Sequence, residues 1–276
     1  IEDLEEEKFN QKNIPNLIRN ILTLRYDPLQ KTTLPILKSN DFISSNDYDI
    51  NFIENNLKNS IETTLESTKN LTISLSGGID STLVLALTRK TYPDLKINAI
   101  SIKFSNSTDE TLIAKKIADF FEVEHEIIDI ENYLLELPSA ISITRMPFWD
   151  IHWYYIAKNA KSKSNFLASG DGGDELFGGY TFRYSKFLSL INPNSSPLDK
   201  IKAYLSCHER DWVPDQEKIF NLKSNFSWKS VNSIFKPFFD NSLSPLDQVF
   251  LADYNGKLLY NFSIIGNKIN HFFNLK

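Results

Sequence analysis

The chain has 276 residues and a mass of 31.8 kDa, and its 41% hydrophobic and 24% charged residues are ordinary for one large or two small globular domains. Its formal net charge of -5, without a stripe of Lys and Arg, argues against a nucleic-acid-binding surface. A single cysteine excludes an internal disulfide and a multi-cysteine metal site, as is typical of a reducing cytosol. No apolar run reaches the roughly 18 residues that cross a bilayer, and no signal peptide opens the chain. We therefore expect a cytoplasmic protein without membrane contact.

Residues 1–66 begin with an acidic run and contain two helix-like segments, IPNLIRNIL and INFIENNLKNSIETTLES, separated by polar stretches with Pro. We interpret them as a helical lead-in that packs on a later domain, with the acidic run as a solvated helix face. Residues 67–276 are predicted to form that domain.

From Leu71 the pattern alternates short apolar strands with helical segments. In order, these segments are LTISLS, STLVLALTRKTY, INAISIKF, DETLIAKKIADFF, VEHEIIDI and ENYLLEL, followed by IHWYYIAKNAK and the strand-like SNFLASG. This alternation predicts an α/β fold with a parallel sheet flanked by helices. Beyond about Leu176, apolar residues at three- and four-residue spacing predict a mainly helical C-terminal part with an aromatic core.

The stretch ISLSGGIDSTL, residues 73–83, begins as a strand and ends as a helix, with two glycines and an aspartate at the junction. Backbone N–H groups at a helix N-terminus favour an anion, and glycines let it approach closely, so a phosphate is the expected ligand. The alternative is a tight turn in which Asp80 or Ser81 caps the helix. The loop GxxxxGK[ST] needs a lysine where Ile79 stands, and GxGxxG is unmatched, which argues against both familiar phosphate loops.

The stretch SGDGGDELFGGY, residues 169–180, also follows an apolar strand and precedes a helical pattern. Its acidic residues Asp171, Asp174 and Glu175 lie among glycines, where carboxylates can approach a cation. Because Mg²⁺ prefers carboxylate and phosphate oxygens, one aspartate from each junction could share a metal with pyrophosphate. The alternative is a calcium-type or purely structural acidic turn, although the pattern D-x-[DN]-x-[DN]-G is not present.

The first motif, LSGGIDS, resembles the SGGxDS loop of the ATP pyrophosphatase (PP-loop) superfamily. Together with SGDGGDELFGGY it resembles the synthetase domain of the asparagine synthetase family, which also includes β-lactam-forming relatives. The resemblance covers residues 50–262 and weakens after Tyr180. It implies a PP-loop α/β fold and an ATP- and Mg²⁺-dependent ligase that activates a carboxylate as an acyl-adenylate, releases pyrophosphate and transfers nitrogen as AMP leaves. The simplest such reaction converts aspartate to asparagine.

The resemblance also implies roles for single positions that match the family's motifs. The implied ATP contacts are Leu75, Ser76, Gly77, Gly78, Asp80, Ser81, Ile102, Ser169 and Gly170, the implied magnesium ligands are Asp80 and Asp174, and the implied catalytic positions are Asp171 and Tyr180. The family's S-[IV]-G-F pattern corresponds to SIKF, in which Lys103 replaces a glycine. Ile102 suits a buried core position equally well.

Adenylation makes the chemistry feasible, because direct attack of ammonia on a carboxylate would have to expel oxide. Charge that builds on the bridging oxygen and pyrophosphate must be neutralised by Mg²⁺, loop amides and nearby cations. Lys103, Arg183 and Lys186 are candidate cations, and each is also explained as a solvated surface charge. Arg145, in TRMPFWDIHWYY, could pair with a substrate carboxylate, although this aromatic segment also suits a packed helix.

Cys207 is a weak candidate nucleophile. The segment YLSCHER predicts a helix, on which the adjacent His208 points about 100° away, so we interpret the thiol as incidental.

Two parts of the family pattern are not matched. Glutamine-dependent members carry an N-terminal glutaminase domain whose first residue is a cysteine nucleophile, so we expect this chain to use free ammonia, an amine, or ammonia from a separate glutaminase subunit. An E-x-R-x-P-F-L-D-like stretch and a later lysine are also unmatched, which predicts an incomplete C-terminal part or impaired catalysis. Two alternatives stay open: a related adenylating synthetase for a lactam or another amide, and a nucleotide-binding partner subunit without turnover. The oligomeric state, a homo-oligomer included, is also open.

Overall fold

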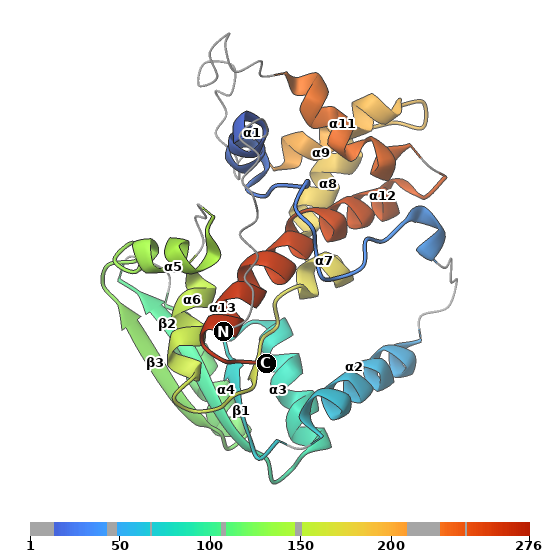
Figure 1. The fold of residues 1–276 in the computed structure, drawn as a ribbon. Coiled ribbons are helices and arrows are strands. Elements are labelled where there is room, and N and C mark those ends of the chain that lie inside the picture. The colour runs from blue at the N-terminus through green and yellow to red at the C-terminus, as the bar shows by residue number, and fades with distance from the viewer. Residues whose placement is uncertain are drawn as a thin grey trace. The chain divides into compact units, whose positions relative to one another are not determined.

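In a computed structural model, the structure describes residues 14–42, 49–66, 68–105, 109–146, 151–208, 227–240 and 242–276. The chain divides into two compact units (Figure 1). The α/β unit comprises Ile43–Phe177 and Ile264–Lys276, and the helical unit comprises Ile1–Phe42 and Gly178–Ser263. The division into a lead-in over residues 1–66 and a synthetase domain over residues 67–276 stays a prediction. In the part of the chain that is described, none of the helices has the length and apolar character needed to cross a bilayer.

A four-stranded parallel sheet lies at the centre of the α/β unit, in the order β3-β2-β1-β4. Figure 1 labels the first three of these strands in the chain. Its strands are β1 (Asn70–Ser74), β2 (Lys96–Phe104), β3 (Glu124–Ile130) and β4 (Leu167–Ala168). Within the sheet, Ile73 of β1 lies opposite Ala99 of β2 on one side and Ala168 of β4 on the other. The chain therefore runs outward from β1 to β3 and then returns to the opposite side of β1. Open α/β sheets bind ligands where the strand order reverses in this way, at the carboxyl ends of the strands.

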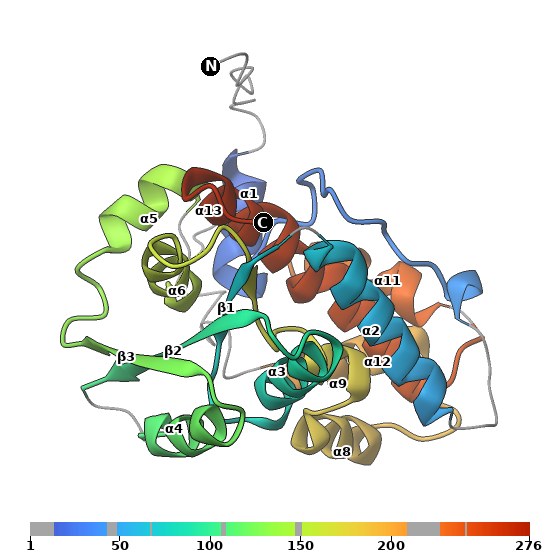
Figure 2. The same cartoon turned by 90° about the horizontal axis from the view of Figure 1, so that it is seen from below.

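Helices cover both faces of this sheet (Figure 2). One face carries α3 (Ile79–Thr91) and α4 (Thr111–Phe120), with α2 (Ile50–Leu65) packed on α3, and the other carries α5 (Leu137–Thr144), α6 (His152–Ala160) and α13 (Asn267–Phe272). Successive side chains of β2 point to opposite faces of the sheet. Ile97 and Ala99 pack in the cluster that contains Leu85 of α3, whereas Ile100 packs in the cluster that contains Ile156 of α6. A strand buried on both faces needs such a continuous apolar run. The structure confirms the predicted fold class.

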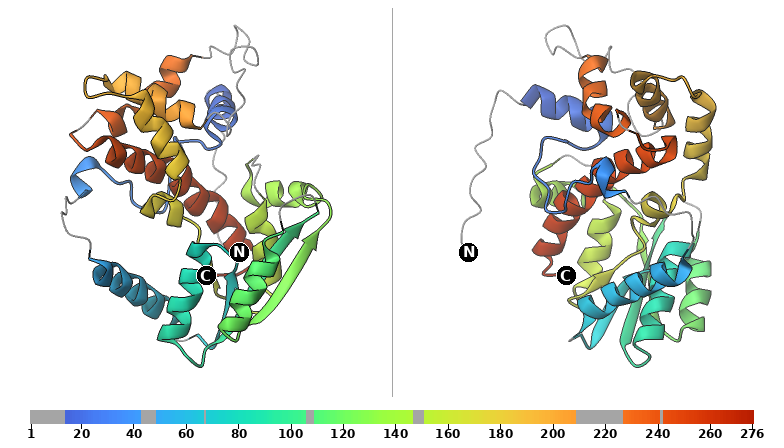
Figure 3. Two further views of the ribbon diagram at one scale, coloured as in Figure 1. Left: turned by 180° about the vertical axis from the view of Figure 1, so that it is seen from behind. Right: turned by 90° about the vertical axis from the view of Figure 1, so that its right-hand side faces the viewer.

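The last residues of the chain return to the α/β unit (Figure 3) and pair with residues at and just before the start of β4. The backbone N–H of Leu167 donates to the carbonyl of Lys276 at 3.0 Å, and the N–H of Lys276 donates to the carbonyl of Asn165 at 2.8 Å. Trp153 of α6 donates from Nε1 to Oδ1 of Asn270 on α13 at 2.8 Å. These bonds attach the C-terminal segment to the α/β unit and cover the edge that the two-residue strand β4 leaves open.

The segment ENYLLEL, predicted as a helix, forms turns over residues 131–136, and α5 begins only at Leu137. Asn132 favours the turn because its side-chain oxygen accepts the N–H of Leu134 at 3.1 Å. Pro138 lies in the first turn of α5, where its missing N–H is not needed. The helix therefore starts one residue before the proline, which is later than the apolar pattern indicates.

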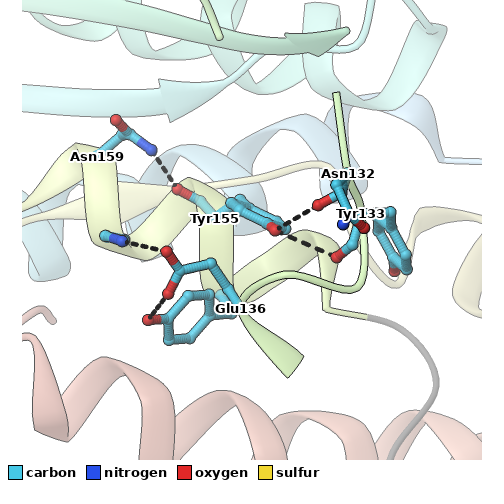
Figure 4. Close-up of polar contacts among 7 residues, drawn as sticks. Asn132, Tyr133, Glu136, Tyr155 and Asn159 are labelled. Carbon is cyan, nitrogen blue, oxygen red and sulfur yellow. Dashed lines mark hydrogen bonds and ion pairs between the residues drawn. The ribbon is translucent and has the colours of Figure 1, made fainter. Parts of the chain in front are cut away.

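These turns are also held by α6. The hydroxyl of Tyr155 donates to the carbonyls of Asn132, at 3.4 Å, and Tyr133, at 3.1 Å (Figure 4). These bonds give partners to two backbone carbonyls outside a helix, so the irregular segment is stabilised without forming one.

The helical unit confirms the mainly helical C-terminal part. Its elements are α1 (Ile14–Leu24), η2 (Ser39–Asp41), α8 (Thr181–Leu190), α9 (Pro197–Cys207), α11 (Trp228–Phe239), α12 (Pro245–Asp253), η4 (Tyr254–Leu258) and the first part of η5 (Asn261–Gly266). Phe187, Phe235 and Phe239 are almost completely buried in its core, together with Tyr204. Its aromatic residues thus form a core, as expected.

Part of the lead-in packs within this unit. Tyr26 stacks on Tyr260 with ring centroids 5.1 Å apart, and the Tyr260 hydroxyl donates to the carbonyl of Pro28 at 2.6 Å. The described segment after α1 therefore lies against the helices at the end of the unit.

Candidate functional site

The first glycine-rich turn joins β1 to α3, which begins at Ile79 with Gly78 as its N-cap residue. Gly77 has a φ of 82°, in the left-handed region that favours glycine. A Cβ at Gly77 would lie 3.1 Å from the backbone nitrogen of Ala114 on α4, so the turn runs close to that helix. The predicted strand-to-helix junction is confirmed, with the helix starting one residue before Asp80.

The hydroxyls of Ser76 and Ser81 stabilise this turn by hydrogen bonds within it. The N–H of Ser76 donates to Oγ of Ser81 at 3.2 Å, and the two hydroxyl oxygens lie 3.0 Å apart. The N–H of Gly78 donates to Oγ of Ser76 at 3.2 Å. Neither Asp80 nor Ser81 is the cap of α3, because Gly78 holds that position without a side-chain cap. The start of this helix thus presents backbone N–H groups beside an exposed turn, which is the arrangement that favours an anion.

The second glycine-rich turn follows β4 and packs directly on the first. A Cβ at Gly170 would lie 2.4 Å from the backbone nitrogen of Ser81, and one at Gly173 would lie 2.5 Å from the carboxyl carbon of Asp80. Non-bonded heavy atoms in a packed protein do not come as close as these distances, so residues 170 and 173 must both be glycine. The structure therefore brings the two sequence motifs together, as we expected from their positions after strands.

Acidic side chains of both turns act on one another where the turns meet. Partial burial raises the pKa of Asp80, and the negative charges of Asp174 and Asp171 raise it further. The hydroxyl of Ser169 donates to Oδ2 of Asp171 at 3.0 Å and so orients that carboxylate. Facing like charges of this kind favour a bound cation, and carboxylate oxygens suit Mg²⁺. No group of three or more His, Cys, Asp or Glu residues in the described ranges forms a metal site by itself, so ligand oxygens would have to complete the coordination.

A cleft of about 380 Å³ opens beside the first turn, at the carboxyl ends of β1 and β2. Its volume is in the range of small-molecule sites. It is lined by Ser74, Leu75, Ser76, Ile100, Ser101, Ile102, Phe104, Glu110, Thr111 and His152. Three of the predicted ATP contacts, Leu75, Ser76 and Ile102, lie in this lining, whereas Asp80 and Asp174 do not. Ser76 belongs to both the cleft and the first turn, which makes the two features continuous.

The sequence analysis missed several residues of the cleft, among them Ser101, Thr111 and His152. Ser101 carries a signal that could have been used, because it is a polar residue inside the apolar run KINAISIKF and is buried. The other two come from α4 and α6, and only the folded sheet shows that these helices border the cleft.

Tyr180, predicted to be catalytic, belongs to the helical unit. It is the N-cap residue of α8, and the guanidinium of Arg183 lies over its ring, 4.4 Å from the centroid. Lys186, on the same helix, donates to the carbonyl of Ser206 at 2.7 Å. The catalytic role of Tyr180 and the cationic roles of Arg183 and Lys186 stay predictions.

Lys103 lies at the end of β2 and forms an ion pair with Asp109 at 3.0 Å. Arg145 is the C-cap residue of α5 with a φ of 57°, a left-handed conformation that is uncommon for a residue other than glycine. The neighbouring residues 147–150 of the aromatic segment lie outside the described residues. Substrate pairing by Arg145 therefore stays a prediction.

The thiol of Cys207 donates to the carbonyl of Ala203 at 3.2 Å, and Nδ1 of His208 lies 2.9 Å from the carbonyl of Tyr204. Each side chain thus bonds the backbone one turn earlier on α9. This arrangement supports the interpretation of an incidental thiol.

Comparison with known proteins adds to this geometry. The family model described as asparagine synthase matches residues 53–246, which is more than half of the chain. Asparagine synthetase (glutamine-hydrolyzing) 1 of Bacillus subtilis is 34% identical over 136 residues, which cover 48% of this chain and 20% of that protein. The putative asparagine synthetase (glutamine-hydrolyzing) 2 of Methanocaldococcus jannaschii is 32% identical over 118 residues, which cover 38% of this chain and 22% of that protein.

The chain thus spans about a fifth of the length of these curated relatives. A solved NH3-dependent NAD synthetase from Campylobacter jejuni matches 71% of this chain and 99% of its own with a TM-score of 0.37 and 14% identity, a likeness too weak to carry an argument. The family match, in contrast, includes both glycine-rich turns and the strands that precede them. By this match over residues 53–246, the chain belongs to the asparagine synthase family.

Proposed function

We propose that the chain is the ATP-binding synthetase part of an Mg²⁺-dependent, amide-forming ligase, and that its simplest reaction converts aspartate to asparagine. One observation carries the proposal: Gly170 and Gly173 pack on Asp80 and Ser81. This contact brings the N-terminus of α3 close to acidic residues from two motifs that are distant in the sequence. Membership of the family supports the same conclusion. We also propose that the protein acts in the cytoplasm, where ATP is available.

In this proposal the nucleotide lies along the cleft and the first turn. The apolar side chains of Ile102 and Phe104 offer packing surface for the adenine ring, and Leu75, directly after β1, adds to this apolar surface. The phosphates lie at Ser76, Gly77 and the start of α3, where backbone N–H groups and the helix dipole favour negative charge. Gly78, Ser81, Ser169 and Gly170 would complete the contacts from the two turns.

The proposed magnesium ligands are Asp80 and Asp174. The raised pKa of Asp80 supports this assignment, because a cation would relieve the repulsion among the carboxylates that raises it. When bound, Mg²⁺ would neutralise negative charge that builds on the phosphates as the ATP is cleaved. Asp171, oriented by Ser169, lies in the same turn and is proposed to position the substrate.

The proposed reaction has two steps. A carboxylate oxygen of the substrate attacks the α-phosphorus of ATP, the bond to the β-phosphate oxygen breaks, and pyrophosphate leaves. A nitrogen nucleophile then attacks the acyl carbon and loses a proton, and AMP leaves with the oxygen it received. The two matched relatives are named as glutamine-hydrolyzing, so we propose ammonia as the nitrogen donor, supplied either free or by hydrolysis of glutamine, for example by a separate glutaminase subunit.

An assay with ATP, Mg²⁺, aspartate and ammonia on the full protein tests the proposal. We expect AMP and pyrophosphate in equal amounts, formed only when a carboxylate substrate is present, with asparagine identified by mass spectrometry. Another amide or a lactam as product would keep the adenylation and correct the substrate. Formation of ADP and phosphate would contradict the proposal. Tight ATP binding without AMP, even with a glutaminase partner, would instead identify a nucleotide-binding subunit without turnover.

A further inference from the structure

Three polar groups connect the first turn to the edge strand β3. The hydroxyl of Ser101 on β2 donates to the carbonyl of Leu75 at 2.5 Å, and the same oxygen lies 2.7 Å from Nε2 of His125 on β3. Ser101 is only 4% exposed. The N–H of Leu75 donates to the carbonyl of Ile100 at 2.9 Å. Leu75, the first residue after β1, is therefore held through both of its backbone groups.

The direction of these hydrogen bonds follows from the donors and acceptors available. A backbone carbonyl only accepts, so the single hydroxyl proton of Ser101 points to Leu75. The hydroxyl oxygen must then accept from His125, whose proton lies on Nε2. The other ring nitrogen, Nδ1, is buried and makes no hydrogen bond within the described part of the chain. The arrangement therefore requires a proton on Nε2 of His125, and the buried Nδ1, which has no partner among the described residues, disfavours a second proton there.

The surroundings of His125 favour the neutral form. Burial lowers the pKa of His125, and the positive charge of Lys115 lowers it further, against the opposite effect of Asp119. Both charged residues lie on α4, which covers this face of the sheet. At neutral pH the imidazole is therefore a fixed hydrogen-bond donor to Ser101.

We propose that Ser101 and His125 are positioning residues, which fix the Leu75 carbonyl and so hold the turn of Ser76, Gly77 and Gly78 in its ligand-binding shape. The identity of the ligand, ATP, rests on the proposed function. The hydrogen bonds that hold the turn are observed independently of it. The reason lies in connectivity: the carbonyl of Leu75 and the N–H of Ser76 belong to one planar peptide group, so fixing one fixes the other. That N–H is the group that bonds Ser81 within the turn.

The chain itself offers a matched control at the other end of β1. Ser164 is 5% exposed, and its hydroxyl donates to the carbonyl of Asn70, the first residue of β1, at 2.8 Å. It also accepts from the N–H of Phe166 at 2.9 Å. Ser164→Ala and Ser101→Ala therefore each remove a hydrogen bond from a buried serine hydroxyl to a backbone carbonyl, one at the start of β1 and the other just after its end, and only the second bond lies beside the turn.

The first test measures the Kd of Mg·ATP by calorimetry in four variants. Loss of a positioning bond of about 1.4 kcal/mol corresponds to a tenfold change. We expect Ser101→Ala and His125→Leu to weaken binding about tenfold. We expect Ser164→Ala, and His125→Gln, whose amide keeps an N–H donor, to stay within about threefold, while the two serine variants lose similar thermal stability. Equal Kd values for the two serine variants would overturn the inference.

The second test needs no nucleotide and keeps the inference separate from the proposed function. Hydrogen exchange of the peptide spanning residues 75–79 should be faster in Ser101→Ala and unchanged in Ser164→Ala. Nitrogen NMR of the histidines should show His125 neutral and protonated on Nε2 at pH 7. If the wild-type protein bound no ATP, the proposed function would fail while this test still decided the inference. Unchanged exchange in Ser101→Ala, or a proton on Nδ1 of His125, would refute it.

Discussion

Gly170 lies against the backbone of Ser81 so closely that a Cβ at residue 170 would be 2.4 Å from the Ser81 nitrogen. The two residues belong to different glycine-rich turns, one after β4 and the other at the start of α3. Their contact makes one continuous surface out of two distant motifs. The proposed site for the ATP phosphates depends on this contact.

The contact predicts a specific sensitivity to size at residue 170. Gly170→Ala forces the two backbones apart, and we expect a loss of about 1–3 kcal/mol in the free energy of unfolding, as for other overpacked sites, together with loss of ATP binding. Gly78→Ala is the control, because the nearest atom to its added Cβ is Oγ of Ser76 at 3.3 Å and its φ of -79° suits any residue. Urea unfolding measures both variants. A Gly170→Ala protein as stable as Gly78→Ala would show that the turns do not touch.

Asp80→Asn should stabilise the fold while it abolishes the proposed metal-dependent activity. The pKa of Asp80 is raised in the folded state, so its ionised form costs stability at pH values above that pKa, and the cost disappears as the pH falls below the unfolded-state pKa. We expect Tm to rise by about 1–3 °C at pH 7 and to be unchanged near pH 3.

The control for this experiment is a carboxyl with the opposite shift. Hydrogen bonds from Ser196 lower the pKa of Asp199 at the start of α9, so Asp199→Asn should lower Tm at pH 7 and have no effect at low pH. Calorimetric melts at the two pH values decide the matter. A lower Tm for Asp80→Asn at pH 7 would contradict the proposed crowding of carboxylates.

Much of the site could be predicted from the sequence because its residues are clustered locally. Glycines and aspartates after two apolar strands indicate both turns, and the parallel sheet follows from the alternation of strands and helices. The contact of Gly170 and Gly173 with Asp80 could not be predicted in detail, because it depends on β4 pairing with β1 across a long stretch of chain. Ser101 and His125 were missed because a single polar residue in an apolar strand does not reveal its partner.

Some local structure was predicted less well where a side chain competes with the helix pattern. Asn132 stabilises a turn and Pro138 sets the start of α5, although ENYLLEL has helical spacing. Apolar periodicity alone does not report such local hydrogen bonds.

An ion-pair cluster between α6 and Glu136, the N-cap residue of α5, makes a prediction about pH. Lys158 and the hydroxyl of Tyr154 both donate to the carboxylate of Glu136, at 2.8 Å and 2.9 Å (Figure 4). These bonds lower the pKa of Glu136, so their stabilisation is present above the unfolded-state pKa and is lost as the pH falls through the folded-state value. Because the ion pair is partly exposed, with 45% of the Lys158 side chain and 24% of the Glu136 side chain open to solvent, we expect Glu136→Gln to cost less than about 1 kcal/mol at pH 7.

A double-mutant cycle with Lys158→Met measures this effect by urea unfolding. The coupling energy between residues 136 and 158 should be favourable at pH 7 and absent near pH 2. A coupling that is the same at both pH values would show that the ion pair does not contribute.

Cys207→Ser should keep the proposed activity, because the thiol bonds a backbone carbonyl of its own helix and a serine hydroxyl can do the same. We expect the initial rate of AMP formation to stay within about twofold of the wild type. A loss of more than tenfold, with an unchanged Tm, would restore the thiol as a candidate nucleophile.

The most direct test of a shared phosphate site is a hydrogen-exchange footprint with Mg²⁺ and an ATP analogue whose α–β bridging oxygen is a methylene group. The analogue cannot be cleaved at that bond, so the complex persists during labelling. We expect slower exchange in the peptides that contain residues 75–81 and, in the same complex, in those that contain residues 169–174. Protection of the first turn alone, or of neither turn, would contradict the conclusion that both turns hold one nucleotide.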